Sequence, residues 1–185
     1  DMTTKDFAEL FSGLRLAYGS YRPNEDNGPG KQKGQYRVVS EDIDDDRLIE
    51  LWDNHLRGVE SLGIVPIRED NSCVWGAIDI DTYPLKHDAL VERLVKRNEL
   101  PFVVARSKSG GAHVFCFVSE PVSASMMQTK LKEIASALGY GTAEIFPKQT
   151  KLLLEKGDRG NILNMPYFGG SSSTRYCHND DGEGI

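Results

Sequence analysis

An apolar run interrupted by two aspartates, VWGAIDIDTY, constrains the fold of this chain more than any other segment. Its β-branched and aromatic residues favour a strand, in which residues two apart point to the same side. Asp79 and Asp81 therefore project together, while Ile78 and Ile80 enter the core. Two carboxylates at this spacing repel each other, and a divalent cation is the usual partner that relieves the repulsion. The segment predicts a buried strand whose end holds Mg²⁺ or Mn²⁺; a solvent-facing acidic edge strand is the alternative.

A second polar motif, ARSKSGGAHVFCF, occupies residues 105–117. Adjacent glycines let a backbone approach an anion closely, and exposed N–H groups at such a turn can bind phosphate. Arg106 and Lys108 add positive charge, and His113 opens the return strand, from which its side chain can reach back over the turn. The motif predicts a phosphate-binding turn, although an ordinary hairpin that contains a histidine has the same pattern.

Apolar spacing along the chain predicts a mixture of helices and hairpins, and hence the α+β class. Helices are expected over residues 7–14 (ending near Tyr18 and Gly19), 44–60, 88–98 and 121–139, the last capped by Ser123 or Ser125. Strands are expected in two hairpins, GIVPI with CVWGAIDI and PFVVARS with AHVFCFVS, and in AEIFP, KLLLE and NILNMPYF. Residues 22–35 are rich in Gly, Pro and Asn and predict an exposed loop.

The composition is that of an ordinary globular domain of 185 residues, 39% hydrophobic and 27% charged. Such a chain can bury about 70% of its unfolded surface, so one compact domain needs neither a disulfide nor a structural metal. Three widely spaced cysteines without a CxxC pair argue for free thiols, and Cys177 with His178 supplies only half of a metal site. No apolar stretch approaches the roughly 20 residues of a membrane span, and the start of the chain has no signal-peptide pattern. A cytoplasmic protein is therefore expected.

The net charge of −6 argues against a duplex-DNA binder with a broad basic surface, but not against an acidic site neutralised by metal ions. The acidic excess at residues 40–54 has a simple explanation, because acids favour the N-terminal turn of a helix. Residues 147–161 have a basic excess, formed by Lys148, Lys151, Lys156 and Arg159. That segment is either a contact for template backbone or triphosphate, or a solvated hairpin.

Four segments, in this order, resemble the successive motifs of the archaeo-eukaryotic primase superfamily: DID, SGGAH, EIFPKQ and GNILNMP. The segment HLRGVESLGIVPI, which precedes the acidic strand, is similar as well. The branch that fits best is the primase-polymerase group of phages, mobile elements and conflict or CRISPR-linked systems. The resemblance extends from about residue 55 to about residue 168.

The resemblance implies a site that holds two ions of Mg²⁺ or Mn²⁺ and a nucleotide. The catalytic and metal-binding residues that it implies are Asp79, Asp81 and, as the best match for the third acidic ligand, Glu144. The triphosphate contacts that it implies are Ser109 and His113, with Arg106 and Lys108 as helpers. The segments that line the nucleotide pocket contribute Lys148, Gln149 and Asn161. Tyr83 is a candidate for stacking on the nucleotide or discriminating its sugar.

The family fold implied is an RRM-like catalytic sheet with a smaller N-terminal αβ lobe. We accordingly predict one catalytic domain over residues 1–170, with the lobe at about 1–70 and the catalytic core at about 71–170. Residues 171–185 are polar and aperiodic, and predict a tail or linker within a longer protein. The chain departs from its relatives in three ways: SGGAH is shorter than SGxGxH, Glu144 does not follow a long apolar strand, and the zinc-binding cysteines of some relatives are absent.

The function implied is that of a primase-polymerase, which extends or starts a primer on single-stranded DNA by two-metal phosphoryl transfer. The expected partners are NTP or dNTP, a primer, a DNA template, and a helicase or other replication domain. A non-catalytic RRM-like nucleic-acid-binding module is the alternative, since an RRM-like sheet can bind nucleic acid without synthesis. A metal-dependent nuclease shares the two-metal chemistry but leaves the triphosphate-binding turn unexplained.

Overall fold

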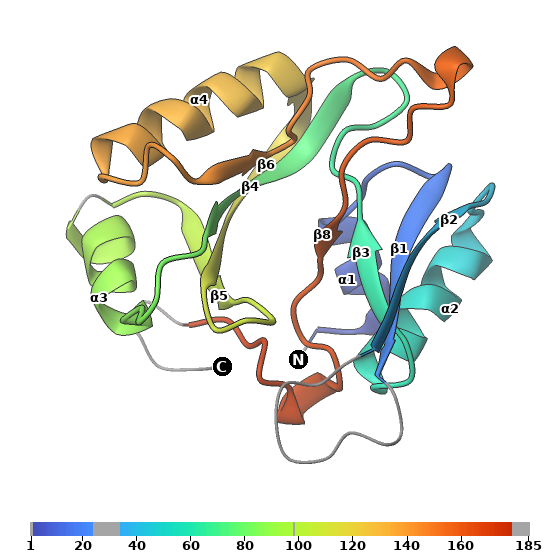
Figure 1. Ribbon diagram of the computed structural model, residues 1–185, viewed down its shortest axis with the longest axis horizontal. Helices are drawn as coiled ribbons and strands as arrows, with labels where there is room; N and C mark the ends of the chain where they lie inside the picture. The colour runs from blue at the N-terminus through green and yellow to red at the C-terminus, as the bar shows by residue number, and fades with distance from the viewer. Residues whose placement is uncertain (1, 24–33, 98, 179–185) are drawn as a thin grey trace.

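The computed structural model describes residues 2–23, 34–97 and 99–178, and Figure 1 shows how their helices and strands are arranged. The elements up to the acidic strand are α1 (Thr4–Leu10), β1 (Ala17–Pro23), β2 (Gly34–Ser40), α2 (Asp45–Leu56), β3 (Ser61–Ile64) and β4 (Ser72–Ile80). The later elements are α3 (His87–Val91) with the π-helical turn Glu92–Arg97, β5 (Phe102–Arg106), β6 (Ala112–Ser123), α4 (Ala124–Ala137), β7 (Glu144–Phe146) and β8 (Leu163–Asn164). Short 3₁₀ helices cover Leu154–Lys156 and Gly170–Ser172.

The described strands form two antiparallel four-stranded sheets, which confirms the predicted α+β class. The core sheet has the strand order β5-β6-β4-β7, and its elements follow one another as β4-α3-β5-β6-α4-β7. This βαββαβ connectivity, with the first and third strands in the centre, is RRM-like. The N-terminal sheet has the order β2-β1-β3-β8, so its edge strand β8 returns from the later part of the chain.

Helices α3 and α4 cover one face of the core sheet (Figure 1). Alternate strand residues such as Ile78, Val104 and Val114 are buried on this face with Leu131 of α4. The side chain of Ser123 accepts a hydrogen bond from the N–H of Met126, so Ser123 is the cap of α4. Because side chains alternate along a strand, the residues between these apolar positions face the opposite side, where the candidate site lies.

The opposite face of the core sheet packs on an aromatic cluster centred on Phe11, which directly follows α1. The ring of Phe11 lies 5.6 Å from that of Trp75 and 5.2 Å from that of Phe115, both in the core sheet, and 5.7 Å from that of Trp52 in α2. The indole N–H of Trp75 donates to the carbonyl of Ser12 at 3.0 Å. The same buried cluster includes residues of the N-terminal sheet, so Phe11 joins the two sheets into one core.

The hairpin of β5 and β6 is confirmed, but several other local expectations are wrong. GIVPI and CVWGAIDI form no hairpin, because β3 pairs with β1 and β8, whereas β4 pairs with β6 and β7. Tyr18 and Gly19 lie in β1 and do not end a helix, and KLLLE contributes to a 3₁₀ turn. An apolar pattern predicts that a segment forms a strand, but it does not predict which strand that segment pairs with, because long-range packing decides the pairing. Within the predicted loop 22–35, residues 24–33 lie outside the described residues.

The boundary expected near residue 70 falls between β3 of the N-terminal sheet and β4 of the core sheet, but the later part of the chain contacts both sheets. Strand β8 completes the N-terminal sheet although it lies at residues 163–164. Residues 171–178 are not a linker, because the N–H of His178 donates to the carbonyl of Val104 at 2.9 Å and Cys177 is buried in a β-bridge with Ala105. This segment therefore pairs with the outer edge of β5, and residues 179–185 lie outside the described residues.

The cysteines Cys73, Cys116 and Cys177 are free thiols, as predicted. Burial raises the pKa of both the Cys73 and the Cys177 thiol to about 11. In the described part of the chain, Cys177 and His178 belong to no group of three or more metal-ligating side chains. None of the described helices is both long enough and apolar enough to cross a membrane.

Replacing Phe11 with alanine should lower the free energy of unfolding by about 3–5 kcal/mol, because the change leaves a cavity in the core that both sheets share. Chemical denaturation followed by circular dichroism measures this loss. Tyr36, exposed on β2, provides the control, since Y36A should change stability by no more than about 0.5 kcal/mol. Equal effects of the two substitutions would contradict the role of Phe11.

Candidate active site

Three polar side chains form a row across the core sheet. In the antiparallel register, Asp79 of β4 stands directly opposite His113 of β6 on one side and Glu144 of β7 on the other. Directly opposed residues of antiparallel strands point to the same face. The neighbouring Ile78 and Ile80 are buried with α3 and α4, so the row of three lies on the face away from these helices. We refer to Asp79, His113 and Glu144 as the polar row.

Asp79 is the most enclosed carboxylate of the polar row. Its Oδ1 lies 3.4 Å from Nε2 of His113, and the side chains of the two residues are only 14% and 10% exposed. Despite this proximity, the buried Oδ1 accepts no hydrogen bond of normal geometry from the residues that the structure describes. A buried carboxylate oxygen without a donor is costly, and a cation that binds it removes this cost. Asp79 is therefore suited to hold positive charge at this position.

Asp81 is exposed directly beyond β4 and is connected to the turn between β5 and β6. The hydroxyl of Tyr83 donates to Oδ1 of Asp81 at 3.1 Å and is also hydrogen-bonded to the hydroxyl of Ser109. The hydroxyl of Ser109 lies 3.4 Å from that of Ser107. A chain of hydrogen bonds therefore joins the acidic strand end to the turn. The two motifs that the sequence placed in separate segments meet in space.

Two glycines determine the shape of this turn. Gly110 has a φ of +92°, a conformation that residues with side chains rarely adopt. Gly111 lies so close to β4 that an added Cβ would stand 2.3 Å from the carbonyl oxygen of Ile80. The N–H of Ser107 donates to the carbonyl of Gly111 at 3.1 Å and closes the turn. The missing side chains therefore allow the turn to lie directly beside the end of the acidic strand.

Lys108, at the tip of the turn, reaches the N-terminal sheet. Its Nζ lies 3.4 Å from the ring centroid of Tyr21 in β1, the geometry of a cation–π contact. The turn therefore presents the charge of Lys108 where the core sheet approaches the N-terminal sheet.

Arg106 does not join the polar row. Its neighbour Ala105 is paired with His113 and shares its face, so the side chain of Arg106 points to the other side of β5. There the guanidinium lies 5.0 Å from the ring centroid of Tyr176, and its Nε is buried without a hydrogen bond to any part of the described chain. The structure thus separates Arg106 from Asp79 and brings it to the C-terminal segment.

The residues predicted near the third acid are placed differently from one another. Lys148 binds Glu144, with 3.1 Å between Nζ and Oε2, and the side chain of Glu144 is 55% exposed. Gln149 donates to Oδ2 of Asp158 at 2.5 Å and so stabilises its own loop. Asn161 is exposed. The structure therefore brings Lys148 to the polar row, but it gives Gln149 a local structural contact.

The donor set fits a divalent cation at Asp79 and Asp81. Carboxylate oxygens are the ligands that Mg²⁺ and Mn²⁺ prefer, and Oδ1 of Asp79 lacks a hydrogen-bond donor. Among residues 2–23, 34–97 and 99–178, however, no three His, Cys, Asp or Glu side chains converge on one cation position. Glu144 could complete the set, although an ion pair with Lys148 engages one of its two carboxylate oxygens and competes with a cation.

Sequence reasoning did not identify His87, whose Nε2 lies 2.8 Å from the carbonyl oxygen of Gly111 in the turn. A single histidine at the start of a helix carries no recognisable signal, and only the fold shows its contact. Tyr83 was predicted as a nucleotide contact, but its hydrogen bonds to Asp81 and Ser109 were not foreseen.

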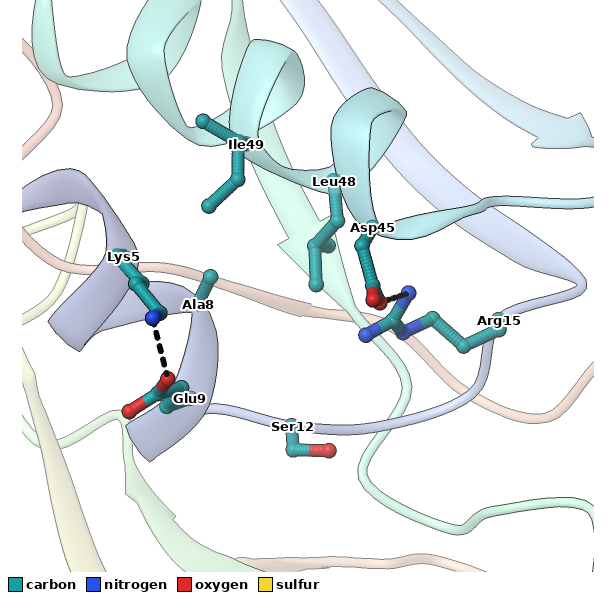
Figure 2. Close-up of a pocket in the computed structure, with 8 residues that line it drawn as sticks. All are labelled: Lys5, Ala8, Glu9, Ser12, Arg15, Asp45, Leu48 and Ile49. Carbon is teal, nitrogen blue, oxygen red and sulfur yellow. Dashed lines mark ion pairs between the residues drawn. The ribbon is translucent and has the colours of Figure 1, made fainter.

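A separate hollow of about 350 Å³ lies between α1 and α2 (Figure 2). It is lined by Lys5, Ala8, Glu9, Ser12, Arg15, Asp45, Leu48 and Ile49. Arg15 forms an ion pair with Asp45 at 3.0 Å, as the dashed line in Figure 2 indicates. None of the predicted site residues lines this hollow, so it is not part of the candidate site.

An RRM-like sheet with paired acids beside a glycine turn is the arrangement expected of a primase-like domain of the nucleotidyltransferase kind. The family model described as "TOTE conflict system, Archaeo-Eukaryotic Primase domain" matches residues 15–178, which is most of the chain. The protein belongs to this family, and its predicted membership of the archaeo-eukaryotic primase superfamily is confirmed. Membership implies interaction with nucleic acid and nucleotides. A comparison with the curated proteins finds no match.

Replacing Gly111 with alanine should destabilise the fold by about 1–3 kcal/mol, because the new methyl group overlaps the carbonyl oxygen of Ile80. Thermal unfolding of the variant measures the effect. Gly141 provides a matched control, since a Cβ there meets its nearest atom at 3.8 Å, and G141A should leave the stability nearly unchanged. A wild-type melting temperature for G111A would contradict the close approach of the turn to β4.

Proposed function

We propose that this chain is a metal-dependent nucleotidyltransferase, a DNA primase-polymerase that adds nucleotides to a primer or starts one on a single-stranded template. One observation carries the proposal: the chain of hydrogen bonds from Asp81 through Tyr83 to Ser109 joins the acid pair to the glycine turn. A polymerase needs these two functions side by side, because its metal-binding acids act on the phosphates that the turn binds. Family membership supports the same reaction class.

In this proposal, Asp79 and Asp81 hold two ions of Mg²⁺ or Mn²⁺, and Glu144 is the third acidic ligand. When bound, such ions lower the pKa of the attacking hydroxyl and stabilise negative charge on the phosphates. Ser109 donates its hydroxyl hydrogen to a phosphate oxygen, which requires that Tyr83 release it. His113 faces the same phosphates from beside Asp79, within the polar row.

The basic side chains have different proposed roles. Lys108 offsets triphosphate charge from the tip of the turn, where it lies at 3.4 Å from the ring of Tyr21. Lys148 balances Glu144 and approaches the nucleotide when that carboxylate binds metal. Gln149 and Asn161 lie in the segment that follows, where the family resemblance predicts the edge of the nucleotide pocket. Arg106 acts at most indirectly, because it lies on the other face of the sheet.

The partners proposed are NTP or dNTP, a primer and a single-stranded DNA template, with a helicase or other replication domain in the full protein. The second candidate function is a non-catalytic RRM-like module that binds nucleic acid. Two observations favour it: Lys148 forms an ion pair with Glu144, the predicted third acid, and the described residues contain no three-ligand metal group. Incorporation of a labelled nucleotide separates the two functions, because a binding module gives none with either metal.

The double substitution of Asp79 and Asp81 by asparagine should reduce nucleotide incorporation on a primed single-stranded template by at least about a hundredfold. Asparagine keeps the shape of each side chain but removes the charge that holds a cation, so the thermal stability should stay near that of the unaltered chain. The assay measures extension of a labelled primer with Mg²⁺ or Mn²⁺.

Asp53, a half-exposed residue of α2 far from the predicted site residues in the sequence, provides the matched control, and D53N should extend primers normally. Undiminished extension by the D79N/D81N variant would refute the assignment of the acid pair. Degradation of the template without any need for nucleotide would instead indicate a nuclease.

The substitutions E144Q and K148M should shift the Mn²⁺ requirement for primer extension in opposite directions. E144Q should raise the Mn²⁺ concentration for half-maximal extension by about tenfold, because a neutral amide binds the cation less well. K148M should lower that concentration, because it removes the ammonium group that competes for Glu144 at 3.1 Å. A metal titration of extension activity measures both changes. An unchanged titration curve for E144Q would exclude Glu144 as a metal ligand.

A further inference from the structure

The loop from Asp81 to His87, which leads from β4 to α3, is connected to the glycine turn at two points. On the exposed side, the hydroxyl of Tyr83 is hydrogen-bonded to that of Ser109. On the buried side, Nε2 of His87 lies 2.8 Å from the carbonyl oxygen of Gly111. The loop and the turn therefore form a closed ring of backbone and hydrogen bonds next to the acid pair.

The contact at His87 is a buried and well-defined hydrogen bond. His87 is 4% exposed, and its ring stacks on that of His178 with 5.4 Å between centroids and 14° between planes. Burial lowers the pKa of His87, and the bond to the Gly111 carbonyl and the charge of Arg106 act on it in opposite directions, so that the net shift is downward. Since the carbonyl of Gly111 can only accept, Nε2 of His87 is the nitrogen that carries the hydrogen.

The carbonyl oxygen of Gly111 receives two hydrogen bonds, one from His87 and one from the N–H of Ser107. Gly111 is also fixed from the side of β4, where the carbonyl oxygen of Ile80 leaves no room for a Cβ. Without the bond from His87, the turn keeps its contact with β4 but loses its connection to α3. Lys108 and Ser109 are exposed at the end of the turn, and the bond at Gly111 holds the base from which they project.

We infer that His87 is a positioning residue for nucleotide binding: its bond to the Gly111 carbonyl holds the turn so that Ser109 and Lys108 meet the triphosphate. This inference rests on the proposed function, because it assumes that the turn binds a nucleoside triphosphate. His87 itself touches neither nucleotide nor metal. It acts on the affinity for the nucleotide and not on the chemical step.

The experiment compares two substitutions of similar volume, H87M, which has no hydrogen-bond donor, and H87Q, whose amide can donate from nearly the same position. Hydrogen exchange of the amides at residues 107–111, measured without any ligand, reports the rigidity of the turn. Calorimetric binding of ATP and dATP with Mn²⁺, and KM and kcat for primer extension, report its function. V91A is the control, because it removes buried methyl groups from the same helix and leaves the His87 bond in place.

H87M should accelerate exchange in the turn and weaken nucleotide binding by roughly five- to tenfold, the effect of one lost hydrogen bond. KM should rise by the same factor with little change in kcat. H87Q should restore both the exchange rates and the affinity, and V91A should lower stability without either effect. If H87M does not fold, H87N takes its place, because its shorter amide does not reach the carbonyl.

Unchanged exchange or unchanged affinity in the variant without a donor would overturn the role of His87 while the proposed function stands. Failure of H87Q to restore affinity would assign the effect to ring packing and overturn it as well. Absence of nucleotide binding by the unaltered chain would overturn the proposed function, and the positioning role with it. The first two results are obtained from variants and the third from the native sequence, so the failures are distinguishable.

Discussion

The register of β4 between β6 and β7 is the constraint on which the candidate site depends. It sets Asp79 opposite both His113 and Glu144, and it fixes which face each side chain occupies. Because strand side chains alternate, a slip of one residue would turn Asp79 toward α3 and α4 and expose Ile78. The apolar packing of Ile78 against the helices therefore stabilises the same register that assembles the acids. Core stability and site geometry follow from one arrangement of the central strand.

A second level of organisation connects distant segments to this strand. The aromatic cluster around Phe11 holds the N-terminal sheet against the core sheet at Trp75 and Phe115. Nearer the acids, the contact of Lys108 with Tyr21 connects the same two sheets. The C-terminal segment closes the outer edge of β5 through His178. Parts of the chain that look independent in the sequence therefore share one core. The segment from residue 171 to residue 178 is therefore packed on the core sheet and is not a separate tail.

The charges of the site are partly balanced within the protein. Lys148 neutralises Glu144, and His113 lies beside Asp79, while Oδ1 of Asp79 remains without a hydrogen bond. In the proposed function, a bound cation would replace Lys148 and His113 as the partner of these two carboxylates.

The sequence by itself determined the α+β class, the β5–β6 hairpin, the three longer helices in outline and the primase resemblance, since each is encoded in local spacing or short motifs. It also selected Asp79, Asp81 and His113 as candidate site residues, because the first two stand two positions apart in one apolar run and the third borders a glycine turn. Only the tertiary structure decided that β3 and β4 belong to different sheets and that Arg106 faces away from the acids. It alone revealed the pairing of Glu144 with Lys148 and the bond from His87 to Gly111. The physical reason is that periodicity specifies which side of an element is buried, whereas long-range register and packing select the element it meets.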